Sequence, residues 1–203
     1  MKIFEVKPLV IPEVKLISYQ RFSDQRGFFT ETFRESDLIQ TLPNFKVKQV
    51  NESFSQKGVF RGLHFQWNPY MAKLVRVING RIIDFFLDIR LNSPTFGKIS
   101  GFELNGNLHD DKNTWIFIPI GFAHGFLALE ETNIEYLCNG EYSPTCEAGI
   151  NPLATDLDWS ICDSNAKQKL EEMKDNLIIS DKDKAGLTLT AWKKDERAKN
   201  FKY

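Results

Sequence analysis

The stretch from Lys73 to Arg90 constrains the fold most, because its apolar residues recur with a period of two. One face of an extended chain would carry only apolar side chains: Ile83, Phe85, Leu87 and Ile89. The opposite face would carry Asp84, Phe86, Asp88 and Arg90. The pattern predicts a strand buried on one side. Asn79-Gly80, just before it, predicts a type I′ hairpin turn, which needs positive φ at both central positions.

Much of the first 160 residues divides in the same way into short strand-like runs separated by turn residues. Residues 93–97 predict a loop, and the run that begins at Trp115 predicts a strand that ends at Pro119. Two further runs, 126–129 and 134–137, predict a strand pair joined by polar residues.

One convincing helix is predicted late in the chain. It begins near Asp163, and Leu170 and Met173 mark its apolar stripe. Many short strands, glycine-rich turns and a single late helix predict an all-β protein. The best candidate is a cupin-like jelly roll (double-stranded β-helix) with short peripheral helices near the C-terminus.

Composition limits the function further. The 203 residues suffice for one domain, 1–203, and 26 basic against 27 acidic residues leave no positive field for nucleic acid. No run approaches the roughly 20 apolar residues of a membrane span, and the first residues do not form a secretory signal. Three cysteines without paired spacing, Cys138, Cys146 and Cys162, predict reduced thiols in a cytoplasmic protein.

Two of the three histidines lie in strand-like segments beside glycine. His64 follows Arg61 and Gly62, and it is either a general base or a half-buried histidine bonded to a backbone carbonyl. Polar residues at odd positions precede it and share one strand face: Gln49, Asn51, Ser53 and Ser55. That face borders either solvent or a binding cavity, and the residues alone do not decide between them.

Residues 119–124 match the PxGxxH pattern of the second cupin motif, whose histidine binds metal in metal-dependent cupins. Here that histidine is His124. The first cupin motif would supply two more histidines, but this chain offers only His64, and His109 lies in a predicted surface loop. The sequence therefore predicts neither a three-histidine metal site nor a cofactor.

Four other residues have both a chemical and a structural interpretation. Tyr136 and Tyr142 are either catalytic or core and rim residues. Arg26, beside a glycine, either holds a phosphate or lies in an exposed turn. Asp183 either caps a turn or orients the His64 imidazole and stabilises its charged form.

Taken together, these segments resemble the dTDP-4-dehydrorhamnose 3,5-epimerase family of nucleotide-sugar epimerases. The similar stretches keep their order over nearly the whole chain: 24–33 (DQRGFFTETF), 49–66 (QVNESFSQKGVFRGLHFQ), 73–88, 93–97 (SPTFG), 118–126 (IPIGFAHGF), 136–147 and 180–183. The combination of RGLHFQ, SPTFG and GFAHGF is highly specific.

The resemblance implies a metal-free jelly roll, usually a homodimer, acting on a nucleotide-linked 4-keto-6-deoxy sugar. It implies that His64 is the base, Asp183 its partner, Tyr136 the acid, and Lys73 the cation that stabilises the enolate. It also implies that eight residues line the cavity or hold the nucleotide or sugar: Arg26, Glu31, Gln49, Asn51, Arg61, Asp84, His124 and Tyr142. An exchanged N-terminal strand is expected to make the site composite.

The chain departs from the family pattern after Tyr142, where residues 143–152 resemble relatives that make other deoxysugars. The departure leaves two forms of the reaction open, inversion at C3 and C5 or at C3 alone. Two other classes also compete, a cupin that binds a nucleotide sugar without turning it over and a metal-dependent cupin.

Overall fold

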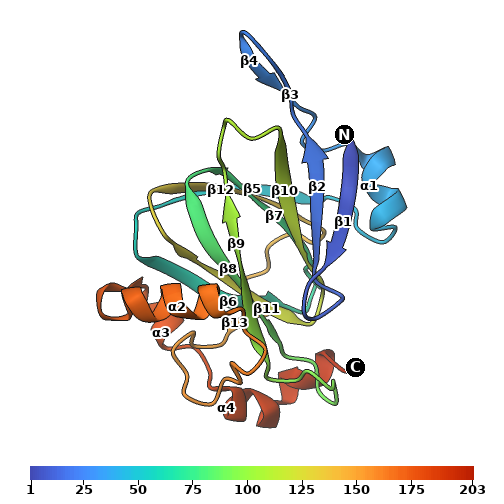
Figure 1. Ribbon diagram of the computed structural model, residues 1–203. Helices are drawn as coiled ribbons and strands as arrows, with labels where there is room; N and C mark the ends of the chain where they lie inside the picture. Colours follow the sequence, from blue (N-terminus) through green and yellow to red (C-terminus); the bar gives the residue numbers. More distant parts are fainter.

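The computed structural model describes all 203 residues. Its body consists of two β-sheets that pack face to face (Figure 1). We call the first sheet 1; its strands, in spatial order, are β1 (Ile3–Pro8), β2 (Lys15–Gln20), β10 (Lys112–Ile118), β7 (Lys73–Asn79), β12 (Thr132–Cys138) and β5 (Gln49–Ser55). The second, sheet 2, contains β13 (Glu147–Gly149), β6 (Val59–Gln66), β11 (Phe122–Ala128), β8 (Arg81–Asp88) and β9 (Ile99–Asn105), with β14 (Ile178–Ile179) beside β6.

The remaining elements are short and lie around the sandwich. A hairpin of β3 (Phe22–Asp24) and β4 (Gly27–Phe29) extends away from the body of the molecule (Figure 1). The helices are α1 (Glu35–Thr41), α2 (Ser164–Met173), α3 (Asp181–Lys184) and α4 (Leu189–Lys194), with 3₁₀ turns at Lys174–Asn176 and Glu196–Asn200. None of the helices is long and apolar enough to cross a membrane.

From β5 to β13, the chain passes from one sheet to the other at every connection except that between β8 and β9. This alternation between two packed, largely antiparallel sheets is the arrangement of a jelly roll, so the predicted fold class is confirmed. The predicted helix is confirmed as α2, whose N-cap carboxylate, Asp163, accepts from the Ala166 N–H at 3.1 Å.

The alternation also explains why two predicted strand pairs are wrong. Asn79-Gly80 joins β7 of sheet 1 to β8 of sheet 2, so it turns a corner of the sandwich instead of closing a hairpin. Only Gly80 has positive φ, at 91°, while Asn79 stays paired in sheet 1. Likewise β11 and β12 follow each other in the chain but belong to different sheets. Local turn signals do not report which sheet receives the next strand.

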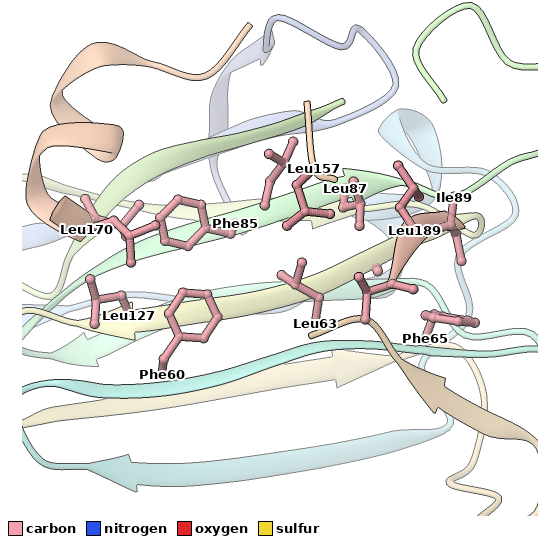
Figure 2. Packing of buried hydrophobic residues seen from close by; sticks show 14 of the residues in the cluster. Phe60, Leu63, Phe65, Phe85, Leu87, Ile89, Leu127, Leu157, Leu170 and Leu189 are labelled. Carbon is pink, nitrogen blue, oxygen red and sulfur yellow. The ribbon is translucent and has the colours of Figure 1, made fainter. Parts of the chain in front are cut away.

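The predicted one-sided burial of β8 is also wrong, because both of its faces are covered. Ile83 and Phe85 belong to a 20-residue core on the outer face of sheet 2, and Phe86 belongs to a second core between the sheets. C-terminal residues, among them Leu170 and Leu189, pack onto that outer face (Figure 2). The distant C-terminal segment thus buries a face that the local pattern had marked as the only apolar one.

One helix was not predicted. In α1, Leu38 is buried together with Leu42 just beyond its end, and both pack in a third core on the outer face of sheet 1. The smaller predictions hold: β10 ends at Ile118 directly before Pro119, residues 93–97 form a loop, and His109 is exposed between β9 and β10.

Candidate active site

A break in strand pairing turns Arg61 and His64 to the same side of sheet 2. Three residues apart, they would lie on opposite faces of a regular strand. In β6, however, His64 pairs with His124 and Arg61 pairs with Phe126. The two residues are three positions apart in β6, whereas their partners are two positions apart in β11, so β6 contains a β-bulge. Gly62 makes this possible with φ of 121°.

The bulge also requires two backbones to approach closely. A Cβ added at Gly62 would lie 2.5 Å from the Gly125 Cα. A Cβ added at Gly125 would lie 2.5 Å from the Arg61 carbonyl oxygen. Gly62 of RGLHFQ and Gly125, the second glycine of GFAHGF, therefore form one packing contact. That contact fixes the direction of the Arg61 and His64 side chains.

Both side chains line a cavity of about 690 Å³ between the sheets. Nine of the twelve residues expected at the site border it: Gln49, Asn51, Arg61, His64, Lys73, His124, Tyr136, Tyr142 and Asp183. The inward face of β5 contributes Gln49, Asn51 and Ser53. The polar face seen in the sequence thus borders a cavity and not only solvent.

His64 is held by a buried carboxylate. Its Nε2 lies 2.6 Å from Asp183 Oδ1, while Asp183 Oδ2 accepts from the Gly62 N–H at 3.3 Å. Burial alone would raise the pKa of the Asp183 carboxyl, but its bonds to His64, Gly62 and Ser180 outweigh burial and lower it. Asp183 is therefore ionised at neutral pH, and Nδ1 of His64 has no protein partner.

A second histidine–aspartate pair lies directly beside the first. His124 Nε2 is 2.8 Å from Asp84 Oδ2, and both side chains are almost wholly buried. Burial lowers the pKa of His124 and raises that of Asp84; each partner opposes the shift of the other without reversing it. Asp84 lies behind His124 and does not border the cavity, where it had been expected; its Oδ1 has no partner.

Sheet 1 carries a cation and a phenol on its inward face. Lys73 pairs with Cys138, and Cys138 pairs with Gln49, so the three lie in one row across β7, β12 and β5. Tyr136 lies in the next row, between Val75 and Asn51. No protein group forms a hydrogen bond or ion pair with the Lys73 ammonium, and burial lowers its pKa despite the opposing charges of Cys138, Asp84 and Glu147.

Tyr136 remains a protonated phenol at neutral pH. Its Oη lies 3.2 Å from Ser53 Oγ. Burial raises the Tyr136 pKa, although the Ser53 hydrogen bond and the Arg61 charge oppose the shift. Because Tyr136 is on sheet 1 and His64 on sheet 2, the phenol and the imidazole reach the cavity from opposite sides.

The cavity mouth contains two charged groups that the sequence did not single out, Glu147 and Lys182, beside Arg61, which it did. Glu147 Oε1 accepts from the Tyr142 hydroxyl at 2.7 Å and pairs with the Lys182 ammonium at 2.5 Å. Arg61 donates from Nε to Ser55 Oγ at 3.0 Å and from a terminal nitrogen to the Phe54 carbonyl. Lys182 adjoins Asp183 in the chain, but no local pattern marks Glu147.

Two expected site residues lie away from this cavity. The Arg26 side chain is 84% exposed on the projecting β3–β4 hairpin and pairs with Asp24 at 2.6 Å. Glu31 pairs with Arg34 and with the amino group of Met1, and these bonds lower the pKa of its carboxyl to about 2. Within this chain, neither residue borders the cavity.

No group of three or more His, Cys, Asp or Glu side chains is arranged to hold a metal ion, and all three cysteines are free. The cavity instead presents a carboxylate-bound imidazole, a neutral phenol and an unpaired ammonium. Such a set can remove a proton on one side of a substrate, return one on the other, and stabilise an intervening oxyanion.

Comparison with known proteins shows which enzymes the chain is similar to. A family model described as dTDP-4-dehydrorhamnose 3,5-epimerase matches residues 8–191. The enzyme of that name from Methanothermobacter thermautotrophicus is 41% identical over 83% of this chain and 85% of its own.

Solved structures agree with the sequence comparison. The Legionella pneumophila dTDP-6-deoxy-D-glucose-3,5-epimerase, in complex with dTDP-4-keto-L-rhamnose, superposes with a TM-score of 0.81 at 34% identity and covers 98% of both chains. A 3′-monoepimerase from Streptomyces bikiniensis, in complex with dTDP-quinovose, gives 0.74 at 29% identity, covering 93% of this chain and 89% of its own. Fold, cavity and sequence together show that this chain is an epimerase and belongs to the dTDP-4-dehydrorhamnose 3,5-epimerase family.

Proposed function

We propose that the protein inverts C3 and C5 of a dTDP-linked 4-keto-6-deoxyhexose without a cofactor, converting the 4-dehydro-6-deoxyglucose form to the 4-dehydrorhamnose form. One observation carries the proposal: His64 and Tyr136 enter the same cavity from opposite sheets. Inversion at a carbon needs a base on one face and an acid on the other. The two layers of the sandwich provide that arrangement.

In the proposed reaction, His64 removes a proton from the carbon beside the 4-keto group, using the ring nitrogen that Asp183 leaves free. The resulting imidazolium is stabilised by the ionised Asp183 carboxylate. Lys73, without a protein partner, stabilises the negative charge that develops on the ketone oxygen. Tyr136 then donates a proton to the opposite face of the carbon.

His124 supports this cycle by staying neutral. It is the strand partner of His64, and the positive charge on one ring disfavours charge on the other. Because burial lowers the His124 pKa, we propose that His124 serves as a hydrogen-bonding wall of the sugar pocket and leaves the proton to His64. Asp84 fixes its orientation at 2.8 Å.

The nucleotide is proposed to lie toward the open end of the cavity. Arg61, fixed by Ser55, offers a guanidinium to the pyrophosphate. Gln49, Asn51 and Tyr142 border the same cavity and supply amides and an aromatic ring. The Legionella pneumophila structure, which contains dTDP-4-keto-L-rhamnose, supports a dTDP-linked substrate.

Inversion at C3 alone is the second candidate, because one of the similar solved structures is a 3′-monoepimerase. Proton NMR of dTDP-4-keto-6-deoxyglucose with the protein in D₂O separates the two. We expect loss of both the C3 and C5 proton signals. Loss at C3 only would establish the narrower reaction, and retention of both signals under saturating protein would contradict either activity.

We also propose a homodimer in which the β3–β4 hairpin of each subunit completes the cavity of the other. Apolar side chains are exposed on this hairpin, at Phe28 and Phe29, and on the outer face of the edge strand β5, at Val50 and Phe54. Pairing of these surfaces would bury them and bring Arg26 and Glu31 to a partner cavity.

Mixing two inactive variants tests the exchange. In a heterodimer of Arg26→Ala and His64→Ala subunits, the Arg26→Ala subunit keeps His64 and receives an intact Arg26 from its partner. We expect activity to return on mixing and refolding. Each heterodimer should have about half the activity of a wild-type dimer, since one of its two sites is complete. A mixture that stays as inactive as its components would place Arg26 in its own subunit's site.

A further inference from the structure

Tyr136 has one hydrogen-bonding partner in the protein. Ser53 Oγ lies 3.2 Å from the phenol oxygen, and no other side chain or backbone group is bonded to that hydroxyl. Ser53 is half-buried and borders the cavity, so its hydroxyl contacts the phenol on one side and open space on the other. Ser53 therefore adjoins the phenol of Tyr136 at the wall of the cavity.

The strand register explains why Ser53 reaches the end of the phenol. Tyr136 pairs with Asn51, and Ser53 pairs with Ile134, so Ser53 is diagonal to Tyr136 on the shared face. Diagonal neighbours are within reach of a long aromatic side chain. The other inward hydroxyl of β5, Ser55 Oγ, accepts a hydrogen bond from Arg61 Nε at 3.0 Å. Ser53 is therefore the hydroxyl of this strand that is available to the acid.

The proposed reaction creates a need that this position meets. After one inversion, His64 carries the proton it removed, and Tyr136 is a phenolate. A second inversion cannot end in protonation until Tyr136 recovers a proton. The phenolate is disfavoured by burial, and Ser53 is the one protein group hydrogen-bonded to its oxygen.

We propose that Ser53 returns a proton to Tyr136 between the inversions at the two carbons. The inference rests on the proposed two-carbon reaction. The Ser53 Oγ–H bond breaks as the Tyr136 Oη–H bond forms, and Ser53 Oγ takes a replacement proton from a water molecule in the cavity. The hydroxide left behind is neutralised by the proton that the His64 imidazolium releases. In sum, one proton moves from His64 to Tyr136, and nothing is oxidised or reduced.

Removal of the hydroxyl tests the relay. In a single turnover with Ser53→Ala in excess over dTDP-4-keto-6-deoxyglucose in D₂O, we expect the first inversion to proceed near its normal rate, because Tyr136 is protonated when the substrate binds. The second should slow about 100-fold, the lower end of what a positioned proton-transfer group contributes. Mass spectra of samples quenched early would then show sugar with one deuteron accumulating ahead of sugar with two.

Three further variants test whether the Ser53 hydroxyl is the cause. Ser53→Thr keeps a hydroxyl on a β-branched residue suited to a strand and should restore the wild-type ratio of single to double exchange. Ser164→Ala, which removes a hydroxyl at the exposed start of α2 and away from the cavity lining, should leave the ratio unchanged. In a Tyr136→Phe background, Ser53→Ala should not further change exchange at the first carbon, because Ser53 acts through the phenol.

The outcomes separate this inference from the function on which it rests. If wild type exchanges both carbons and Ser53→Ala keeps its ratio, the relay is overturned and the function stands. Another outcome is that Ser53→Ala also slows exchange in the Tyr136→Phe background as much as it does in the wild-type background. That result would mean that Ser53 supports folding or binding, which also overturns the relay. Wild type that exchanges neither carbon, or C3 alone, would overturn the two-carbon reaction itself.

Discussion

His64→Ala is expected to reduce hydrogen exchange beside the 4-keto group by about 10⁴-fold, the upper end of the range for a general base. Two other titratable groups of the cavity, His124 and Tyr136, are unsuited to replace the base. His124 is bonded to Asp84 behind it, and the Tyr136 pKa is raised by burial. Loss of the C3 proton signal in D₂O, followed by NMR at saturating substrate, measures the effect without needing product release.

The third histidine supplies a matched control. His109 is exposed in the loop between β9 and β10, far from the cavity lining, so His109→Ala should leave exchange unchanged. The His64 side chain is 34% exposed, and its removal should leave the fold intact, which circular dichroism can verify. Exchange in His64→Ala above one tenth of the wild-type rate would show that another group takes the proton.

Lys73→Met is expected to lower kcat by about 10²- to 10³-fold, the loss associated with removing one group that stabilises an oxyanion. Methionine preserves most of the side-chain volume and removes the charge. Because the charge is required mainly when the enolate forms, KM should change much less than kcat. Lys112→Met, at the exposed start of β10, is the control and should have no effect.

The alkaline limb of the pH profile gives a second measurement on Lys73. Burial lowers its pKa, so its ammonium is lost at a lower pH than that of an ordinary lysine. Wild-type kcat should therefore begin to fall at correspondingly lower pH as the lysine deprotonates. Lys73→Arg, which stays charged, should push this limb to higher pH. An alkaline limb that lies at the same pH in Lys73→Arg as in wild type would show that Lys73 does not supply the charge.

The sequence predicted the fold class and nine residues that border the cavity, but not their spatial relations. Period-two patterns identified strands correctly, because alternation reflects local geometry. Asn79-Gly80 misled because a turn signal does not specify the sheet that receives the next strand. Asp183 is bonded to a histidine 119 residues away, and no periodicity connects them; only resemblance to a family indicated the pair.

For other residues of the cavity, the sequence indicated only part of their position or nothing at all. Ser53 was noticed as part of a polar strand face, yet its contact with Tyr136 depends on the diagonal register of β5 and β12. Glu147 occupies an unremarkable position in the sequence and gains its place at the cavity mouth through pairing with Gln66. Arg26 and Glu31 lie outside the cavity of their own chain, so their predicted role depends on a second subunit.

The mismatch between β6 and β11 has a consequence for how this scaffold can diversify. Arg61 and His64 are separated by a backbone step that the contact between Gly62 and Gly125 fixes. In the proposed function, the pyrophosphate bound by Arg61 and the carbon deprotonated by His64 are thus held at a set separation, which the residues of the cavity mouth do not determine. Changes around Tyr142 can then alter which nucleotide base is accepted while the chemistry stays aligned. Substrate choice and reaction type become independently adjustable traits.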